Sequence, residues 1–425
     1  MIEEITVTEG RAGLAIYRVE VEAPNIATGV SQFDPLALLL ERYPTPTGRH
    51  VLERFPGMGS SIGPSSFRVA CHVVSFPDVM LVIDTTFHTT SREIFPELLE
   101  CITRDERRRP AARPIWVLYT HAHVDHAGGR NAVEGMGDAV RIFTHPYTAE
   151  LFPLMSGREA FFRTGDSFLR DCGISKPCDE IREEVRDLYR GMIEAAGTRE
   201  EDHPFSTRSE GPLHVDEFVD PQNATTTLDE ERIQILRFDG HIPGHLCVLI
   251  DREHLITGDM WLPATTSTVT PGTIARRAGV PADRCGVDRY VESCERLLAK
   301  DVDRCFSYPS HEHVFRNPKR MAMRDLELLQ ERSALVYEVL REHRRKPMRV
   351  LDLAWGGTRG LPIWKLGGVK YGPLLAHDEA AAYVQDLLAF GDLREVEPER
   401  YLWNETSEFS WALEATLKWE RHRYA

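Results

Sequence analysis

The sequence predicts a mixed α/β protein of two or three domains, built around a buried sheet. Residues 115–119 (IWVLY) form an uninterrupted apolar run of strand length, which is typical of a strand covered on both faces. A long amphipathic stripe with helical spacing follows over residues 322–340. The 425 residues are 42% hydrophobic and 28% charged, which is ordinary globular usage and excludes disorder and collagen-like structure.

The N-terminal part is expected to be rich in β-structure. Short apolar runs predict strands at 14–21, 67–76, 78–84 and 115–119. Residues 95–103 have the spacing of a helix. The strand at 78–84 ends in Asp84, and the strand at 115–119 leads directly into His121. Polar residues therefore stand where two buried strands end.

Residues 148–220 differ in composition and predict a mostly helical insertion whose second half is polar loop. Its apolar residues share one helical stripe, formed by Ile181, Val185, Leu188, Tyr189, Met192, Ile193 and Ala196.

The C-terminal half predicts further strands and helices in turn. Strands are expected at 232–238, 246–250, 254–257 and 305–308, and helices at 287–300, 322–340, 378–390 and 408–424. The stretch 393–403 reads as a hairpin. Helices followed by a short hairpin predict a winged-helix-like appendage over 321–425, attached to a body over 1–320.

Charge and cysteine content favour a cytoplasmic enzyme with a small-molecule substrate. Acidic residues outnumber basic ones 66 to 51, so the net charge of −15 argues against a nucleic-acid partner. The first twenty residues lack a signal-peptide pattern, and no apolar run approaches the ~18–20 residues that span a bilayer, so no membrane partner is expected. The eight cysteines are scattered, as reduced thiols usually are. Aromatic residues near the C-terminus leave a homo-oligomer open.

One segment, residues 119–129 (YTHAHVDHAGG), carries the strongest chemical signal. Three histidines and one aspartate lie within six residues, directly after a buried strand. Imidazole and carboxylate are good ligands for zinc and iron. In such a turn His121 and His123 can point to one metal, while Asp125 and His126 point to a second.

Three further ligand-type residues follow in order at predicted strand ends or turns. They are His245 in GHIPGH, Asp259 in TGD and His311 in YPSH, with His313 as an alternative to His311. Metal sites are commonly assembled in this way, from residues that the fold brings together. The ordered set is far more specific than any single piece.

The ordered set resembles the metallo-β-lactamase superfamily over about residues 5–312, in the pattern of a glyoxalase II-like metallo-hydrolase. The resemblance implies an αββα sandwich with the metal site at one edge. It implies a first metal at His121, His123 and His245, a second at Asp125, His126 and His311, and Asp259 as the bridge. Asp125 and Asp259 would be the catalytic carboxylates. Asp84 would support the histidine-rich loop through hydrogen bonds.

The implied cofactors are two divalent ions, with zinc favoured over iron or manganese. Two ions ~3.5–4 Å apart share a hydroxide that attacks a carbonyl or phosphoryl centre. We expect hydrolysis of a small ester-like substrate such as a thioester or lactone. A phosphodiesterase or nuclease of the same fold is the alternative, which the net charge disfavours despite the basic run at 107–109. A noncatalytic relative is disfavoured because all seven ligand positions are filled.

The insertion at 148–220 is expected to cover the substrate, because both its ends return near the metals. Several of its aromatic residues fit either this lid or packing onto the body, among them Phe152, Phe161, Phe162, Phe168 and Tyr189.

Overall fold

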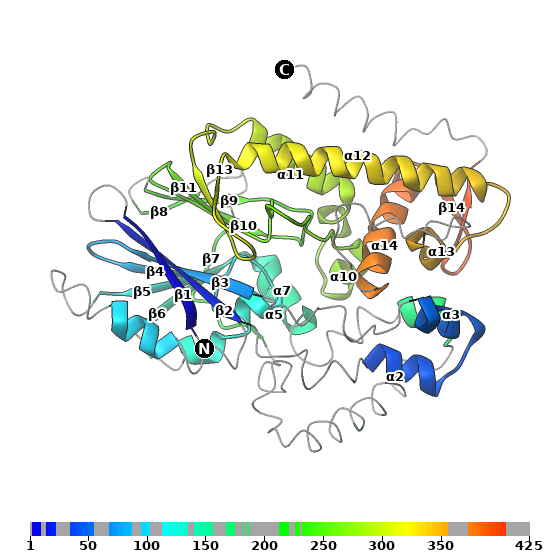
Figure 1. Cartoon of the computed structure of the whole chain (residues 1–425), viewed down its shortest axis with the longest axis horizontal. Helices are drawn as coiled ribbons and strands as arrows, with labels where there is room; N and C mark the ends of the chain where they lie inside the picture. The colour runs from blue at the N-terminus through cyan, green and yellow to red at the C-terminus, as the bar shows by residue number, and fades with distance from the viewer. Residues whose placement is uncertain are drawn as a thin grey trace.

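The computed structural model describes most of the chain, in several stretches. They are residues 2–9, 14–22, 35–54, 68–86, 95–102, 113–134, 140–155, 167–174, 181, 184, 187, 212–220, 226–229, 232–355 and 373–404. Two sheets lie against each other, with helices on their outer faces (Figure 1).

The first sheet has seven strands that follow one another in chain order. They are β1 (Ile2–Glu9), β2 (Ala15–Glu22), β3 (Arg68–Ser75), β4 (Met80–Ile83), β5 (Ile115–Leu118), β6 (Val140–Thr144) and β7 (Glu217–Phe218). Neighbours from β1 to β4 are antiparallel, and neighbours from β4 to β7 are parallel. Parallel pairing puts the carboxyl ends of β4 and β5 at one edge, so the residues that follow each strand meet there.

The second sheet has six strands in the order β13-β12-β11-β10-β9-β8. They are β8 (Thr226–Asp229), β9 (Ile233–Arg237), β10 (Leu246–Ile250), β11 (His254–Gly258), β12 (Phe306–Pro309) and β13 (Phe315–Arg316). Strands β11 and β12 are parallel, which brings the residues after both strands to the same edge.

Alternating side chains divide the buried core into three layers. Between the sheets, Val74 of β3 packs in one cluster with Val248 of β10. The neighbouring Val73 faces the other way, into a cluster with Leu98 and Phe152 from helices outside the first sheet. The order helix, sheet, sheet, helix is an αββα sandwich, and it confirms the expected fold class.

Helices outside the first sheet are the segment 95–102, α5 (Val124–Ala127), α6 (Arg130–Glu134) and α7 (Pro146–Met155). On the second sheet's outer side lie α11 (Val287–Leu298), α12 (Pro318–Glu342), α13 (Val350–Ala354) and α14 (Pro373–Ala389), and their apolar residues join those of β9–β11 in one cluster. Helices α2 (Pro35–Arg42) and α3 (Pro46–Arg54) add Leu39, Leu40 and Val51 to that cluster. Short helices α10 (Gly272–Arg277) and η5 (Ala282–Arg284) precede α11.

The C-terminal elements follow the expected order of helices and then a hairpin. The hairpin consists of β14 (Leu393–Glu397) and β15 (Arg400–Trp403), which pair antiparallel. Tyr383 of α14 and Trp403 of β15 belong to the same apolar cluster as Leu236 of β9. The C-terminal elements thus share a core with the second sheet, and the predicted domain border at residue 320 stays a prediction.

The described parts of the expected insertion contact the body. Phe152 of α7 is buried outside the first sheet, and Phe168 is buried in the cluster outside the second sheet. These two aromatic side chains therefore pack onto the body, which was one of their two expected roles. Phe161, Phe162, most of the predicted stripe and the predicted helix at 408–424 lie outside the described residues.

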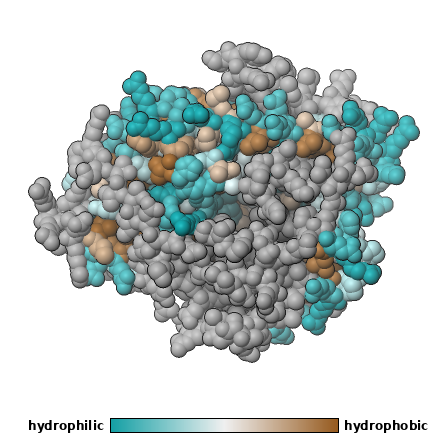
Figure 2. Space-filling model, in the orientation of Figure 1, coloured by the Kyte–Doolittle hydropathy of each residue, from teal (hydrophilic) through white to brown (hydrophobic). Residues whose placement is uncertain are grey.

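The described surface is mainly polar on the face seen in Figure 2, with hydrophobic residues in small separate patches. Large exposed apolar side chains among the described residues, namely Phe218, Met323 and Val396, are far apart in the sequence. Within the described stretches, no helix has both the length and the apolar character needed to cross a membrane.

Candidate metal centre

Seven ligand-type side chains from both sheets converge at one edge of the sandwich. His121 and His123 follow β5, and Asp125 and His126 lie on α5, which begins directly after His123. The second sheet contributes His241 from the β9–β10 turn, Asp259 after β11 and His311 after β12. The side chains form two groups, His121–His123–His241–Asp259 and Asp125–His126–His311.

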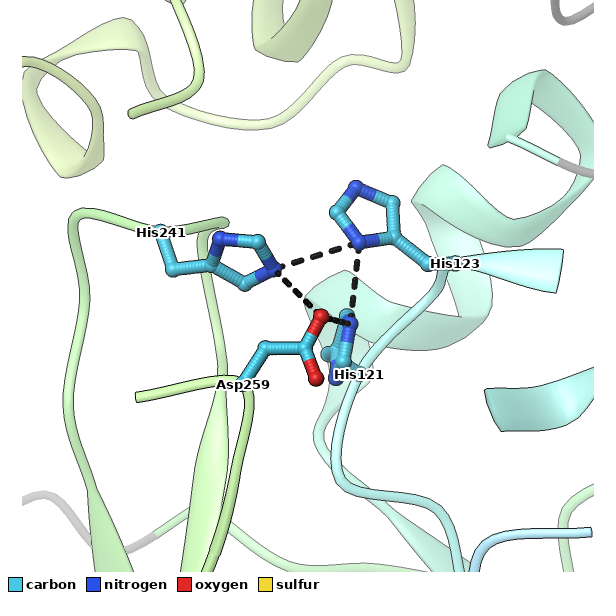
Figure 3. A group of neighbouring side chains, drawn as sticks. All are labelled: His121, His123, His241 and Asp259. Carbon is cyan, nitrogen blue, oxygen red and sulfur yellow. Dashed lines mark hydrogen bonds and ion pairs between the residues drawn. The ribbon is translucent and has the colours of Figure 1, made fainter. Parts of the chain in front are cut away.

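The first group is drawn in Figure 3, where three imidazole rings and a carboxylate point toward one another. His121 Nε2 lies 2.9 Å from His123 Nδ1, and His241 Nε2 lies 3.2 Å from the same atom. Two ligand nitrogens on one tetrahedral zinc ion would lie about 3.4 Å apart, given Zn–N bonds of about 2.1 Å. The observed spacing is close to that value, so the three nitrogens can share one ion.

The second group is held together by contacts between imidazole and carboxylate. His311 Nε2 lies 3.3 Å from Asp125 Oδ2, and His126 Nε2 lies 3.7 Å from the same oxygen. His126 is fully buried, whereas the side chains of Asp125 and His311 keep 13% and 12% of their exposure. The open side of this group is therefore the side of Asp125 and His311.

Asp259 lies between the two groups and faces both with different oxygens. Its Oδ2 is 3.8 Å from His121 Nε2 and 3.6 Å from His241 Nε2. Its Oδ1 is 3.2 Å from His126 Nε2 and 3.4 Å from His311 Nε2. A carboxylate in this position can give one oxygen to each of two ions.

Acceptors outside the cluster hold the Nδ1 protons of four histidines. His241 donates to the Thr268 carbonyl at 2.8 Å and His311 to the Arg68 carbonyl at 2.7 Å. His126 donates to Asp84 Oδ2 at 2.8 Å. The Thr120 hydroxyl donates to Asp84 at 2.8 Å, so it accepts from His121 Nδ1 at 2.9 Å. Each ring therefore directs its Nε2 toward the cluster, where this nitrogen binds a metal once it carries no proton.

Burial and charge give the two groups opposite electrostatic character. Burial lowers the pKa of His121 and His241, and it lowers the pKa of His123 to about 3, so these rings are neutral at pH 7. Burial also acts to lower the pKa of His126 and His311, but Asp259 and Asp125 outweigh it. They raise the pKa of His126 well above its usual value and that of His311 to about 10. Asp259 and Asp125 thus favour a positive charge at the second group.

Two buried atoms at the centre lack the hydrogen bonds that buried polar atoms normally make. Within the described residues, His126 Nε2 and Asp259 Oδ1 have no hydrogen-bond partner, although they lie 3.2 Å from each other. A shared cation would satisfy both atoms. The donor set of imidazoles and carboxylates suits zinc, iron or manganese, so the residues present fit two divalent ions.

Asp84 supports the histidine-rich loop in the way that the family resemblance implied. It is 1% exposed and directly follows β4 in a left-handed conformation, with φ of 62°. Its carboxylate accepts from the Thr120 backbone amide at 2.8 Å as well as from His126. These contacts fix the loop before a ligand binds.

The structure differs from the sequence expectation at the first metal, because His241 and not His245 joins His121 and His123. His245 directly precedes β10 and lies on the same side as Cys247, whose Sγ is 4.0 Å from His245 Nδ1. Its Nε2 accepts from the Asp259 backbone amide at 3.3 Å. His245 therefore supports Asp259 from behind, and the sequence reasoning overlooked His241 in the same GHIPGH motif.

Glycine is required beside His245. Gly258 has φ of +55°, and a Cβ there would lie 2.7 Å from His245 Nε2.

The other expected positions lie where the sequence placed them. Asp125, His126 and His311 come together as one group, and Asp259 lies between the groups. His313, the alternative to His311, is exposed and in neither group. His145 is in neither group and contacts Asp220 at 3.2 Å.

Comparison with known families gives one match, to the metallo-beta-lactamase superfamily, over residues 66–311. This range is more than half of the chain and contains all seven side chains of the two groups. None of the proteins with curated descriptions matches the chain by sequence.

Solved structures of low sequence identity share the fold. A metallo-beta-lactamase family protein from Thermus thermophilus is 18% identical, with a TM-score of 0.52, covering 79% of this chain and 94% of its own. A beta-lactamase domain protein from Burkholderia ambifaria is 17% identical, with a TM-score of 0.55, covering 94% of each chain. The second alignment extends the likeness beyond the catalytic sandwich to most of the chain.

Proposed function

This chain belongs to the metallo-β-lactamase superfamily, whose members are metallo-hydrolases, and we propose that it hydrolyses a small ester-like substrate with two divalent metal ions. Thioesters, lactones and related carboxylic-acid derivatives are the proposed substrate class. The observation that carries the two-metal proposal is Asp259, whose two oxygens face two separate ligand groups.

Bound metal ions would supply Lewis acidity here, which ionises water near neutral pH and polarises a carbonyl oxygen. The chain's own residues prepare this chemistry. Neutral rings of His121, His123 and His241 offer lone pairs without first losing a proton. The carboxylates of Asp259 and Asp125 supply negative charge, which offsets the positive charge of the two metal ions.

Substrate would approach from the partly exposed side. The buried rings of His121 and His126 close the inner side, whereas Asp125 and His311 keep some exposure. We therefore assign Asp125 as the carboxylate nearest the substrate, placed to orient the attacking water and to accept its proton. The lid over residues 148–220 stays a proposal.

Carboxylic-acid derivatives are favoured over phosphodiesters because of charge. The chain carries a net charge of −15, which opposes the approach of a polyanion. We also propose zinc as the resident metal and the cytoplasm as the location. Seven cysteines of the described stretches are free, six of them buried, as expected in a reducing compartment.

Metal analysis combined with a substrate panel tests the proposal. Protein purified without chelator should carry close to two equivalents of metal, and should hydrolyse thioesters or lactones far faster than phosphodiesters. The exposed His313→Ala variant serves as a control that should change neither result. A stoichiometry that stays at one after metal supplementation contradicts the two-metal site. Preference for phosphodiesters contradicts the substrate class.

A further inference from the structure

His311 belongs to the second sheet by sequence, but residues of the first sheet hold its position. Its Nδ1 donates to the Arg68 carbonyl at 2.7 Å, at the start of β3. The Ala70 backbone amide donates to the Ser310 carbonyl at 2.7 Å. The loop after β12 is therefore fixed across the gap between the sheets, next to the ligand that completes the second group.

Arg18 of β2 makes the third contact of this kind. Its guanidinium donates through Nη1 to the Pro309 carbonyl and through Nη2 to the Glu312 carbonyl. These two carbonyls lie on either side of His311. Arg18 is only 4% exposed, and its Nε donates to Glu20 at 2.9 Å, which orients the planar group. One side chain thus bridges both ends of the short ligand segment.

The segment that Arg18 bridges is conformationally costly. Glu312 has φ of 65°, a left-handed conformation that non-glycine residues seldom adopt. Its side chain accepts from the Ala264 backbone amide, so the same residue also contacts the loop that follows Asp259. Because the backbone does not favour this turn by itself, contacts from outside must hold it.

We propose that Arg18 is a positioning residue. It holds His311 in place, and so sets the affinity of the second group, Asp125–His126–His311, for its metal ion. This inference rests on the proposed two-metal function. Arg18 acts through the backbone on both sides of His311. It also lies before residue 66, where the match to the family begins, so the N-terminal hairpin of this chain supplies part of its own metal site.

The test compares two Arg18 variants with a matched control. Arg18→Met removes the donors and keeps the aliphatic stem, whereas Arg18→Lys keeps the charge and loses the planar fork. Arg232→Met is the control, since Arg232 makes a two-bonded ion pair with Asp251 on the second sheet, at 3.0 and 3.2 Å. Each full-length protein is stripped of metal and titrated with Zn²⁺ alone. Hydrogen exchange of the metal-free proteins is followed over residues 306–316 and 119–127.

We expect Arg18→Met to weaken the second Zn²⁺ equivalent about 10–100-fold, the usual effect of losing a group that orients a ligand. The first equivalent should stay within about twofold, and Arg18→Lys should lie between wild type and Arg18→Met. Exchange should speed up over 306–316 and not over 119–127. Arg232→Met should change neither readout.

Unchanged binding of both equivalents in a folded Arg18→Met protein overturns the inference, and so does an equal loss of both. If Arg18→Met does not fold, Arg18→Lys decides by the same criteria. If wild type itself binds one equivalent, the two-metal function fails, and the exchange experiment alone decides the role of Arg18. Faster exchange over 306–316 then supports its role in holding His311, and equal exchange overturns it.

Discussion

Single residues set the chemistry of the site through the ring nitrogen that each histidine directs toward the cluster. The Nδ1 atoms of His126, His241 and His311 donate hydrogen bonds to carbonyl or carboxylate acceptors. Their Nε2 atoms therefore point toward the cluster. His245 has no such arrangement, because its Nε2 already accepts from the backbone of Asp259. Two histidines four residues apart thus have different roles.

Alanine variants of these two histidines should separate the roles. His241→Ala removes a nitrogen from the first group, so we expect that group to lose its metal and activity to fall by at least ~100-fold, more than the loss of an outer partner. His245→Ala should keep both metals, and its activity should fall only about 10-fold, because His245 supports Asp259 and does not bind a metal itself. Metal analysis and steady-state kinetics give both results. The reverse order of severity would restore His245 as the ligand.

Asp259→Asn tests the carboxylate between the groups. The amide keeps the shape but removes the negative charge that faces both groups, so we expect both equivalents of metal to bind more weakly and activity to fall by at least ~100-fold. Circular dichroism should stay unchanged. Near-normal turnover in this variant would show that Asp259 does not bridge. The loss of a single metal would assign it to one group.

Secondary-structure elements in the C-terminal part are joined by buried charges. Arg332 of α12 and Glu379 of α14 pair at 2.6 Å, and both side chains are 1% exposed. Arg332 also donates to Thr266 at 2.7 Å, in the loop after Asp259. The long helix therefore connects the C-terminal elements to a loop beside the metal centre.

Removing one partner of this pair should be costly. Arg332→Met leaves Glu379 buried without its cation, and we expect the free energy of unfolding to fall by about 3–5 kcal/mol. The double variant with Glu379→Leu should recover most of that loss, because no buried charge remains. Lys319→Met is the control on the same helix, since its partner Asp303 is exposed and stability should hardly change. Denaturant unfolding measures all three, and equal stability of the single and double variants would contradict this account.

A second buried pair makes stability depend on pH. His377 of α14 lies 3.2 Å from Asp171 of the helix at 167–171. Burial acts to lower the pKa of His377, but Asp171 and Asp378 outweigh it and raise the pKa to about 9. The folded protein therefore holds a proton that the unfolded chain releases near pH ~6.5. The stabilisation is complete below pH ~6.5 and is lost as the pH rises through about 9.

The pH profile of unfolding should show this contribution, on the order of 3 kcal/mol. We expect His377→Gln to destabilise the protein most at about pH 6 and progressively less toward about pH 10. Denaturant unfolding at a series of pH values gives the difference between wild type and variant. His214→Gln, at an exposed site, is the control. A difference that is constant with pH would mean that His377 is neutral in the folded protein.

At the scale of the whole molecule, the metal centre lies where the two sheets meet, beside their apolar packing and the hydrogen bonds around His311. The first sheet supplies His121, His123, Asp125 and His126, and the second supplies His241, Asp259 and His311. Metal ions bound to both sets would connect the two halves of the sandwich. The positive charge of the ions would also offset the repulsion between the carboxylates of Asp125 and Asp259.

Metal removal should therefore lower global stability. Binding to the folded state alone adds about 4 kcal/mol when free metal is about 1,000-fold above its dissociation constant. We expect Tm to fall by several degrees on treatment with chelator and to recover with added Zn²⁺. Calorimetry of Asp259→Asn provides the control, since its Tm should respond less. An equal response in both proteins would place the stabilising metal elsewhere.

The sequence by itself located most of the strands and helices, and its resemblance to the superfamily implied the layers of the sandwich and the ligand set. Apolar periodicity located strands such as β5 and β11, and the ligand-type residues that follow these two strands were recognisable. His121, Asp125, His126, Asp259 and His311 all lie near strand ends, where local pattern fixes their position in the fold. The same reasoning expected the helices α11 and α12.

Only the tertiary structure decided between His241 and His245, because side-chain direction within a turn depends on backbone dihedral angles and on contacts that spacing does not encode. The turn is shaped by Gly240 and Gly244, both with positive φ, and by a bond from the Gly244 amide to Asp239 at 2.8 Å. Arg18 was equally invisible in the sequence, since the carbonyls it contacts lie 291 and 294 positions away. Contacts across such separations follow from how the two sheets pack, which no local pattern contains.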